Sequence, residues 1–342
     1  MAQGSTATTI LRIAAAAAVV SAIYSKIAHD EFLPGAVIGF VNGAAMSWVE
    51  IVVIRTWAEP TLRRLPFLVT LSVRAAALFA VAVLVNAIFV PLFNGFSMAQ
   101  VGEPQDIVFA LSVSLAGSLI ISVADLLGID VLFGIVAGLY HRPRVEERAL
   151  LFIDLRASTA TAERLGGPRF LDFLNAVFAD LSNAIIENGG QIHKYVGDEI
   201  IATWRLAPGR NEPRILGAWA AARRRIADGS GRYRSEFGLA PEFRAALHAG
   251  EVVVGELGSR KKEIALIGDP MNTAARMLEA CRALDCPALA SAALMDRLAG
   301  FPRAVKPRAI PPLPLRGKAE PLALVALAEN EATASASALA EL

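Results

Sequence analysis

Two aspartates stand where strand-like segments end, and their carboxylates could hold a metal ion. Asp154 follows the apolar run 149–153, and Asp198 lies between the strand-like runs 191–196 and 199–204. A strand, a helical crossover and a second strand form a right-handed unit with parallel strands, so their carboxyl ends meet at one edge of the sheet. Two carboxylates beside a phosphate suit Mg²⁺, which leaves coordination positions for phosphate oxygens. The alternative, a solvated turn aspartate, fits either residue taken alone.

A second group of polar residues opens a predicted helix. Asp269 suits the N-cap and Pro270 the first helical position of a helix expected to run to about Leu284. Asn272 and Arg276 are four residues apart and therefore share one face of that helix. An amide and a guanidinium side by side near a helix start suit anion binding, whereas an exposed helix face is the plainer alternative.

The elements that must position these groups follow from the hydrophobic periodicity. Apolar residues at intervals near 3.6 predict a helix over 160–187, which Gly189-Gly190 ends. The other expected elements of this half are a tight hairpin of 191–196 and 199–204, a second hairpin of 242–248 and 251–257 around Ala249-Gly250, an extended Pro-rich segment over 307–314, and a last strand over 322–327.

Composition divides the chain into two unlike halves. Of 342 residues, 55% are hydrophobic and 19% are charged, and the formal charge of +1 gives no electrostatic support for nucleic-acid binding. Residues 1–140 hold 14 charged residues, or 10%, whereas the remaining 202 hold 51, or 25%. The second proportion is ordinary for a soluble domain and the first is not. The sequence therefore predicts a membrane half followed by a water-soluble half.

Four apolar stretches in the first half approach the roughly 17–25 residues that cross a membrane. They cover 10–25, 34–54, 66–93 and 107–124. The first stretch is interpreted as an uncleaved span rather than a signal peptide, because no basic cluster precedes it and three more spans follow. Glu50 and Arg74 lie inside predicted spans and are expected to pair across helices, as a structural ion pair rather than part of a transport path.

Basic residues in the connecting segments predict the orientation of the spans. The segment 94–106 contains no Lys or Arg, whereas basic residues occupy the segment 55–65 and the region after the last span: Arg55, Arg63, Arg64, Arg142, Arg144 and Arg148. The positive-inside rule then places both termini and the soluble half in the cytoplasm of a multi-pass protein of the cell (inner) membrane. Lys26, in the first outer loop, is a mild counter-signal.

The domain boundaries follow from these patterns. The expected parts are a membrane domain of four helices (an all-α transmembrane bundle) over 1–128, a linker helix over 129–147, a soluble domain over 148–327 and a disordered tail over 328–342. Cys281 and Cys286 are expected to be reduced packing residues, because two cysteines cannot form a disulfide framework and supply too few ligands for zinc.

The ordered set of motifs in the soluble half resembles the class III adenylate/guanylate cyclases over about 148–327. The resemblance rests on Phe152-Ile153-Asp154, Lys194-Tyr195-Val196-Gly197-Asp198-Glu199, Gly268-Asp269 through Asn272 to Arg276, and Arg316-Gly317-Lys318. It implies an α+β ferredoxin-like palm that works as a head-to-tail homodimer with active sites at the interface. The membrane-bound enzyme would take part in signal transduction.

The resemblance also implies a role for each matching residue. Asp154, Asp198 and the Leu155 carbonyl would bind two Mg²⁺ (or Mn²⁺) per active site, and Asn272 and Arg276 would stabilise the transition state. Substrate contacts would come from Lys194 on the adenine ring, the phosphate loop 156–159 with Ser158 and Thr159, Arg244 and Arg316 on phosphates, and, as a weaker candidate, Lys318. The 3′-hydroxyl of ATP would attack its own α-phosphate, giving cyclic AMP and pyrophosphate. No side chain is required as a general base.

Two departures from the family pattern concern the loop and the base pocket. Many members have Gly-Phe where this chain has Ala157-Ser158, so a positive φ at Ala157 would strain the loop. Ala265 stands where adenylate cyclases usually place Asp or Thr to accept a hydrogen bond from the adenine amino group. Lys194 nevertheless favours ATP, because an ammonium donor suits the adenine N1 acceptor and opposes the guanine N1–H donor.

Three alternatives stay open. Ala265 leaves room for a guanylate or mixed-specificity cyclase. A diguanylate cyclase shares a related palm, but Val196-Gly197-Asp198-Glu199-Ile200 lacks the second glycine of its turn, and that family does not supply the Asn272/Arg276 pair. A catalytically silent membrane receptor would carry the same domain without turnover. The residues favour a membrane-bound adenylate cyclase, and they leave the regulatory signal undefined.

Overall fold

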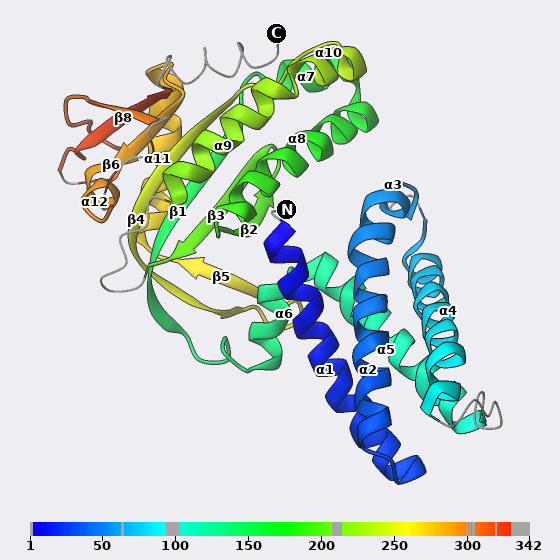
Figure 1. Cartoon of the computed structure of the whole chain (residues 1–342). Helices are drawn as coiled ribbons and strands as arrows, with labels where there is room; N and C mark the ends of the chain where they lie inside the picture. Colours follow the sequence, from blue (N-terminus) through cyan, green and yellow to red (C-terminus); the bar gives the residue numbers. More distant parts are fainter. Residues whose placement is uncertain are drawn as a thin grey trace. The chain divides into compact units, whose positions relative to one another are not determined.

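The computed structural model describes residues 3–62, 65–93, 103–206, 214–298, 300, 302, 305–318 and 320–329. The chain divides into two compact units, Met1–Leu132 and Phe133–Leu342 (Figure 1). The first unit holds helices and the second holds a mixed α/β domain, as the charge distribution along the sequence predicts.

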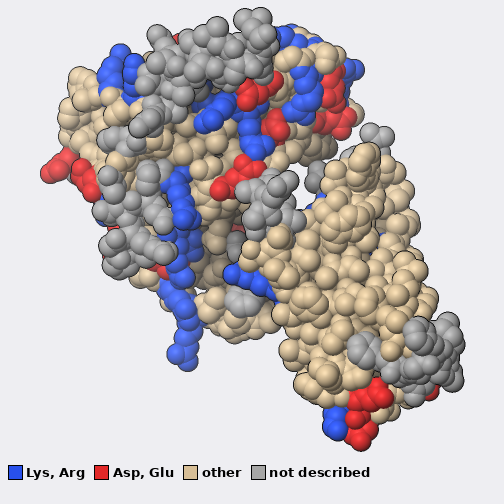
Figure 2. All heavy atoms as spheres, in the orientation of Figure 1, with Lys and Arg blue, Asp and Glu red and all other residues tan. Residues whose placement is uncertain are grey.

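The first unit is a helical bundle. Its elements are α1 (Gln3–His29), α2 (Leu33–Trp48), the π-helix η1 (Val49–Ala58), α3 (Glu59–Leu62), α4 (Phe67–Phe93) and α5 (Pro104–Leu127). Four segments are long and apolar enough to cross a membrane, which confirms the expected four: Ala7–His29, Leu33–Ala58, Phe67–Leu92 and Pro104–Leu126. On the face that Figure 2 shows, the described surface of this unit carries few charged side chains, and most of them lie at one end. Arg63, Arg64 and residues 94–102, on which the orientation argument partly rests, lie outside the described residues.

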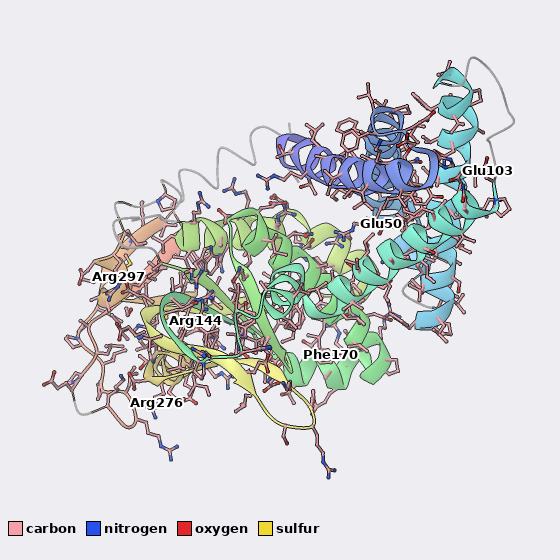
Figure 3. The ribbon with its side chains drawn as sticks, turned by 90° about the horizontal axis from the view of Figure 1, so that it is seen from below. Glu50, Glu103, Arg144, Phe170, Arg276 and Arg297 are labelled. Carbon is pink, nitrogen blue, oxygen red and sulfur yellow. The ribbon has the colours of Figure 1, made fainter. Side chains whose placement is uncertain are left out.

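Charged side chains inside the bundle pair with one another. The Arg74 Nε lies 3.9 Å from a Glu50 carboxylate oxygen, as expected, and the Arg74 Nη1 donates to Asp125 Oδ2 at 2.7 Å, which the sequence did not indicate. Glu50 projects from η1 (Figure 3). Asp125, which is partly exposed, also accepts from Arg55 at 3.2 Å, so the buried Arg74 and Glu50 belong to a group of four charges that balance one another.

The expected linker helix over 129–147 is wrong in its extent. Gly128 takes a φ of 86° and ends α5, and a short α6 covers only Ile129–Val136. Gly138 also has a positive φ, of 67°, and β1 begins at Arg144. Glycine adopts such conformations readily, and they cannot continue a right-handed helix. The segment therefore contains a bend, one short helix and the start of the sheet.

Within the described residues, the second unit has one eight-stranded sheet in the order β2-β3-β1-β4-β6-β8-β7, with β5 paired to β4. The strands are β1 (Arg144–Leu155), β2 (Gln191–Val196), β3 (Glu199–Arg205), β4 (Phe243–Leu257), β5 (Glu263–Ile267), β6 (Ala288–Ser291), β7 (Val305–Ala309) and β8 (Leu324–Glu329). The β2–β3 hairpin is confirmed. β8 extends two residues into the expected tail, and 330–342 lie outside the described residues.

Helices cover both faces of this sheet. They are α7 (Ser158–Leu165), α8 (Gly167–Glu187), α9 (Arg214–Asp228), α10 (Ser230–Phe237), α11 (Asp269–Ala283) and α12 (Ala292–Met295). Successive β1 side chains point to opposite faces, so Leu151 packs in the core formed with α8 and α9, and Leu150 packs in the core that includes Met277 of α11 (Figure 1). The single expected helix over 160–187 is two helices, because Gly166 takes a φ of 77° between them.

The expected hairpin around Ala249-Gly250 is wrong, because β4 runs through both residues without a turn. Gly250 pairs in register with Arg148 of β1. A Cβ at Gly250 would lie 2.6 Å from Pro270, so the glycine permits the start of α11 to approach the sheet closely. The turn lies further along, between β4 and β5.

Candidate active site

The two aspartates of the predicted metal site meet at one edge of the sheet. Asp154 is the penultimate residue of β1, and Asp198 lies in the β2–β3 turn that Gly197 forms with a φ of 63°. β1 and β2 are parallel, as expected, although β3 is inserted between them and is antiparallel to both. Asp154 is the register partner of Glu199, the residue after Asp198. The crossover therefore brings together carboxylates that are far apart in sequence.

Three carboxylates crowd this edge, and their charges perturb one another. Burial, together with the charges of Asp154 and Asp198, raises the pKa of Glu199 to about 7. Burial also raises the pKa of Asp154, with a further contribution from Asp198, while Arg282 and Arg244 act in the opposite direction. Crowded, partly buried carboxylates are stabilised by a divalent cation, so the donor set fits Mg²⁺ or Mn²⁺. Glu199 occurs in the motif, but only the strand register shows that it belongs to this cluster.

Two arginines accompany the carboxylates. Arg282, near the end of α11, donates to Asp154 Oδ2 at 3.0 Å, a contact that the sequence alone did not suggest. Arg244 of β4 is the register partner of Asp154 on the other side of β1. Its side chain is largely buried, and Nη2 lies 3.6 Å from Asp285. Arg244 therefore lies beside the aspartate edge, its phosphate contact stays a prediction, and Arg282 is an additional cation there.

The loop after β1 contains the positive φ at Ala157 that would strain it. Ala157 is left-handed, with φ 52° and ψ 31°, which costs an L-residue other than glycine about 1–2 kcal/mol. Ser158 and Thr159 are the first residues of α7, so their amides belong to its free amino end. Leu155 closes β1 with its side chain buried. A cavity of about 310 Å³ is lined in part by 155–158 and 239–242.

The second polar group lies on the first two turns of α11. Gly268 is the N-cap residue, so Asp269 is the first helical residue rather than the cap, and its carboxylate accepts from Lys318 and Thr273. Asn272 is exposed, and Arg276 is half-buried and projects from the same helix (Figure 3). The Arg276 guanidinium approaches Gly317 closely, since a Cβ there would lie 3.1 Å from Nη2. Arg316, next to Gly317, is exposed.

The length of α11 separates the two polar groups within one chain. Arg282 contacts Asp154, whereas Asn272 precedes Arg282 by ten residues on the same helix. At 1.5 Å per residue, this places Asn272 about 15 Å from Arg282 along the helix axis. The sequence-predicted residues therefore form two groups within one protomer, named half-sites below: Asp154, Leu155, Asp198, Arg244, Ser158 and Thr159 in one, and Asn272, Arg276 and Arg316 in the other.

The predicted base-contacting residues lie on β2 and β5. Lys194 of β2 is half-exposed, and its Nζ lies 3.2 Å from Glu263 Oε2. Ala265 is two residues beyond Glu263 on β5 and pairs with Gly255 of β4. Alternate residues of a strand share a face, so Glu263 and Ala265 lie on the same side of β5. The sequence motifs assigned no role to Glu263. The position of Glu263, two residues before Ala265, is the signal that could have identified it.

Comparison with known sequences identifies the domain. The Adenylate and Guanylate cyclase catalytic domain family matches residues 140–287. Adenylate cyclase 2 of Rhizobium meliloti (strain 1021) is 36% identical over 192 residues, which cover 56% of this chain and 53% of that protein. An uncharacterised protein of Mycobacterium tuberculosis (strain ATCC 25618 / H37Rv) is 33% identical over 158 residues, which cover 44% of this chain and 28% of that protein.

A comparison of folds agrees with the sequence comparison. The structure of a bacterial light-regulated adenylyl cyclase superposes with a TM-score of 0.53 at 18% sequence identity, covering 69% of this chain and 68% of that one. This similarity concerns the fold alone. The family match over residues 140–287, together with the sequence similarity, shows that the second unit of this chain contains a class III adenylate/guanylate cyclase catalytic domain.

Proposed function

We propose that the chain is a membrane-bound adenylate cyclase that converts ATP to 3′,5′-cyclic AMP and pyrophosphate. The 3′-oxygen of ATP forms a bond to the α-phosphorus, and the bond from that phosphorus to the α–β bridging oxygen breaks. The 3′-hydroxyl proton passes to water or to a substrate phosphate oxygen, so no protein base is needed. The carboxylate edge at the end of β1 is the observation that carries this proposal, because phosphoryl transfer depends on positioning and charge neutralisation.

Asp154, Asp198 and the Leu155 carbonyl would hold two Mg²⁺ or Mn²⁺ ions. When bound, such ions acidify the attacking hydroxyl and neutralise the leaving phosphates. The chain's contribution is a set of crowded carboxylates, in which burial, together with the charges of Asp154 and Asp198, raises the pKa of Glu199 to about 7. Arg282 balances part of that charge through its 3.0 Å contact with Asp154. The ions would replace Arg282 as the partner of Asp154.

Backbone amides and arginines would bind the triphosphate. The amino end of α7, at Ser158 and Thr159, offers unpaired N–H groups to a phosphate, and Arg244 lies beside the same carboxylate edge. Arg316 is exposed and suited to the terminal phosphates, whereas Lys318 is already bonded to Asp269. Arg276 would offset charge that develops on the α-phosphate, a contribution of about 3–4 kcal/mol by analogy with oxyanion donors.

A homodimer would bring the two half-sites together. Asn272 and Arg276 of one protomer would face the carboxylate edge of its partner, because within one chain they lie about 15 Å and about 9 Å along α11 from Arg282, which contacts Asp154. Each chain carries both sets, so the dimer would have two complete sites. The four spans would anchor the enzyme in the cell membrane, with the N-terminus and the catalytic domain in the cytoplasm.

Lys194 favours ATP as the substrate. Its ammonium is half-exposed on β2 and can donate to the adenine N1, whereas guanine presents a donor at that position. Ala265 supplies no side-chain acceptor for the adenine amino group, so relaxed selectivity is the main alternative. A guanylate cyclase or a silent receptor would have the same fold as an adenylate cyclase. It would differ in which nucleotide, if any, it converts.

Turnover with each nucleotide tests the proposal. The full-length chain in membranes would be assayed with ATP and with GTP separately, in Mg²⁺ and in Mn²⁺. We expect faster cyclisation of ATP, a loss of nearly all product in Asp154→Asn, and an eroded ATP preference in Lys194→Glu. Equal rates for both nucleotides would contradict the adenine assignment. The absence of product from either nucleotide would instead support the silent receptor.

A further inference from the structure

The end of the bundle where α1 stops and α5 begins brings one histidine and two carboxylates together. His29 is the last residue of α1, Glu103 is the N-cap residue of α5, and Asp106 lies in its first turn. One potential ligand atom from each lies within 4.8 Å of the other two. Glu103 lies where the α5 ribbon begins (Figure 3). This is the arrangement in which a metal ion would join two helices.

The distances suit coordination with small adjustments. The His29 Nε2 lies 2.9 Å from Asp106 Oδ1, and two ligands at about 2.0–2.1 Å from one ion can have this separation at an angle near 90°. Ligands of one tetrahedral ion are about 3.3 Å apart, so the Glu103 ligand atom, within 4.8 Å of the other two, would move by up to about 1.5 Å. Two carboxylates and a neutral imidazole would together balance the charge of a divalent cation.

Neighbouring groups already orient the ligands. The Tyr24 hydroxyl donates to Asp106 Oδ1 at 2.7 Å, and the Gln105 amide donates to Glu103 Oε2 at 2.9 Å. Such outer contacts fix the direction of metal-binding side chains in proteins. A cavity of about 390 Å³ within the bundle is lined by Tyr24, His29 and Asp106, which gives an ion and its water ligands access.

We propose that His29, Glu103 and Asp106 form a binding site for a divalent transition-metal ion of the Zn²⁺ class. An imidazole with two carboxylates is a donor set that Zn²⁺ accepts, with one position left for water. The site lies in the helical bundle and is independent of the catalytic carboxylates. Occupancy would link the end of α1 to the start of α5.

A zinc titration of the full-length chain in detergent micelles tests this site. The metal-stripped protein would receive Zn²⁺ in excess Mg²⁺, which occupies the catalytic carboxylates, and retained zinc would be measured by mass spectrometry after desalting. We expect about one ion per chain. His29→Ala should abolish retention, and Tyr24→Phe, which removes only an orienting hydrogen bond, should weaken binding about tenfold. If His29→Ala does not fold, the weaker zinc binding expected of Tyr24→Phe still tests the proposal.

Two controls decide the location of the ion. His141 forms a similar pair with Glu256 at 2.8 Å, but Lys262 lies 2.9 Å from the same carboxylate and opposes a cation, so His141→Ala should retain zinc. Asp198→Asn should also retain it. Retention that is lost in Asp198→Asn but kept in His29→Ala would place zinc at the catalytic edge and overturn the proposal. Absence of retained zinc in the unmodified chain would overturn it as well.

Discussion

The Lys194 ammonium of β2 lies 3.2 Å from the Glu263 carboxylate of β5. Each side chain is about half exposed, so the pair itself contributes only about 0–1 kcal/mol to stability. The location of the pair matters more than its contribution to stability. Glu263 shares a face of β5 with Ala265, whose side chain cannot accept a hydrogen bond from a base. An ammonium has three donor hydrogens, so Lys194 can hold Glu263 and still donate to adenine N1.

The first prediction concerns Glu263 as the missing acceptor for the adenine amino group. Glu263→Ala should lower kcat/KM for ATP by about tenfold, since a hydrogen bond to a charged group contributes roughly 1.5–3 kcal/mol. The rate with GTP should change less, because guanine presents a carbonyl at the corresponding position. The measurement is kcat/KM for both nucleotides in the full-length chain.

Glu256→Ala is the matched control, because Glu256 lies on the neighbouring strand β4 and is bonded to Lys262 and His141 instead. An equal loss in both variants would mean that the charge of the hairpin, and not Glu263 itself, matters. An unchanged ATP rate in Glu263→Ala would exclude the carboxylate from base recognition.

The sequence predicted correctly the features that depend on residue type and hydrophobic periodicity within a short segment. Charge density separated the two units, and the apolar runs predicted the four candidate spans. The strand–helix–strand pattern predicted that Asp154 and Asp198 lie at one edge of the sheet. The two strands of such a unit are parallel, so this prediction needed no knowledge of other tertiary contacts. The glycine of the β2–β3 turn was equally readable, since a two-residue hairpin requires a positive φ.

The failures arose where long-range packing decides a local conformation. Gly250 reads as a turn residue, but it is a strand residue that admits Pro270, which is twenty positions away in sequence. Arg282 gave no local signal, because its partner Asp154 comes from a distant strand, and the contact of Glu263 with Lys194 is likewise long-range. The linker was expected to be one helix because its apolar composition outweighed the breaks at Gly128 and Gly138.

The second prediction follows from the separation of the half-sites along α11. Asp154→Asn and Arg276→Ala should each be nearly inactive alone, since each removes one half of every site. When the two variants are co-expressed, a mixed dimer has one site with both defects and one intact site. Free mixing should therefore restore about a quarter of the unmodified rate. Cyclic product in membranes measures the recovery, and co-expression without any recovery would contradict a shared site.

The third prediction treats Arg282 as a competitor of the metal for Asp154. Arg282→Met should lower the Mg²⁺ concentration that gives half-maximal activity by several-fold, because the cation no longer has to displace a guanidinium 3.0 Å from the carboxylate. The metal-free protein should melt at a lower temperature, because Asp154, Asp198 and Glu199 then repel one another with only Arg244 left as a nearby counter-charge. The two effects have opposite signs, which a general loss of folding would not produce.

Arg260→Met provides the control for that variant, since Arg260 is exposed near the β4–β5 turn and away from the carboxylates in sequence. It should leave both the magnesium dependence and the melting temperature unchanged. A higher Mg²⁺ requirement in Arg282→Met would mean that the arginine helps to shape the metal site instead of competing for it.

The fourth prediction concerns His248, which is buried in β4 and hydrogen-bonded to Ser291 at 2.7 Å. Burial lowers the pKa of this imidazole to about 4, with contributions of the same sign from Lys318 and Arg297 and an opposing one from Asp269. The unfolded chain takes up the proton near pH 6.5, whereas the folded chain resists it until about pH 4. Stability is therefore fully present above pH 6.5 and falls as the pH decreases through that interval, by up to about 3 kcal/mol.

The melting temperature of the chain in micelles should accordingly fall on acidification from pH 7 to pH 4.5, and His248→Asn should reduce that decrease by several degrees. Asparagine retains a polar partner for Ser291 but does not take up a proton, so the difference between the two slopes isolates the imidazole from carboxylates that titrate in the same range. Parallel slopes for His248→Asn and the unmodified chain would mean that the folded state protonates His248 as easily as the unfolded state, and burial in β4 would then not hold the ring neutral.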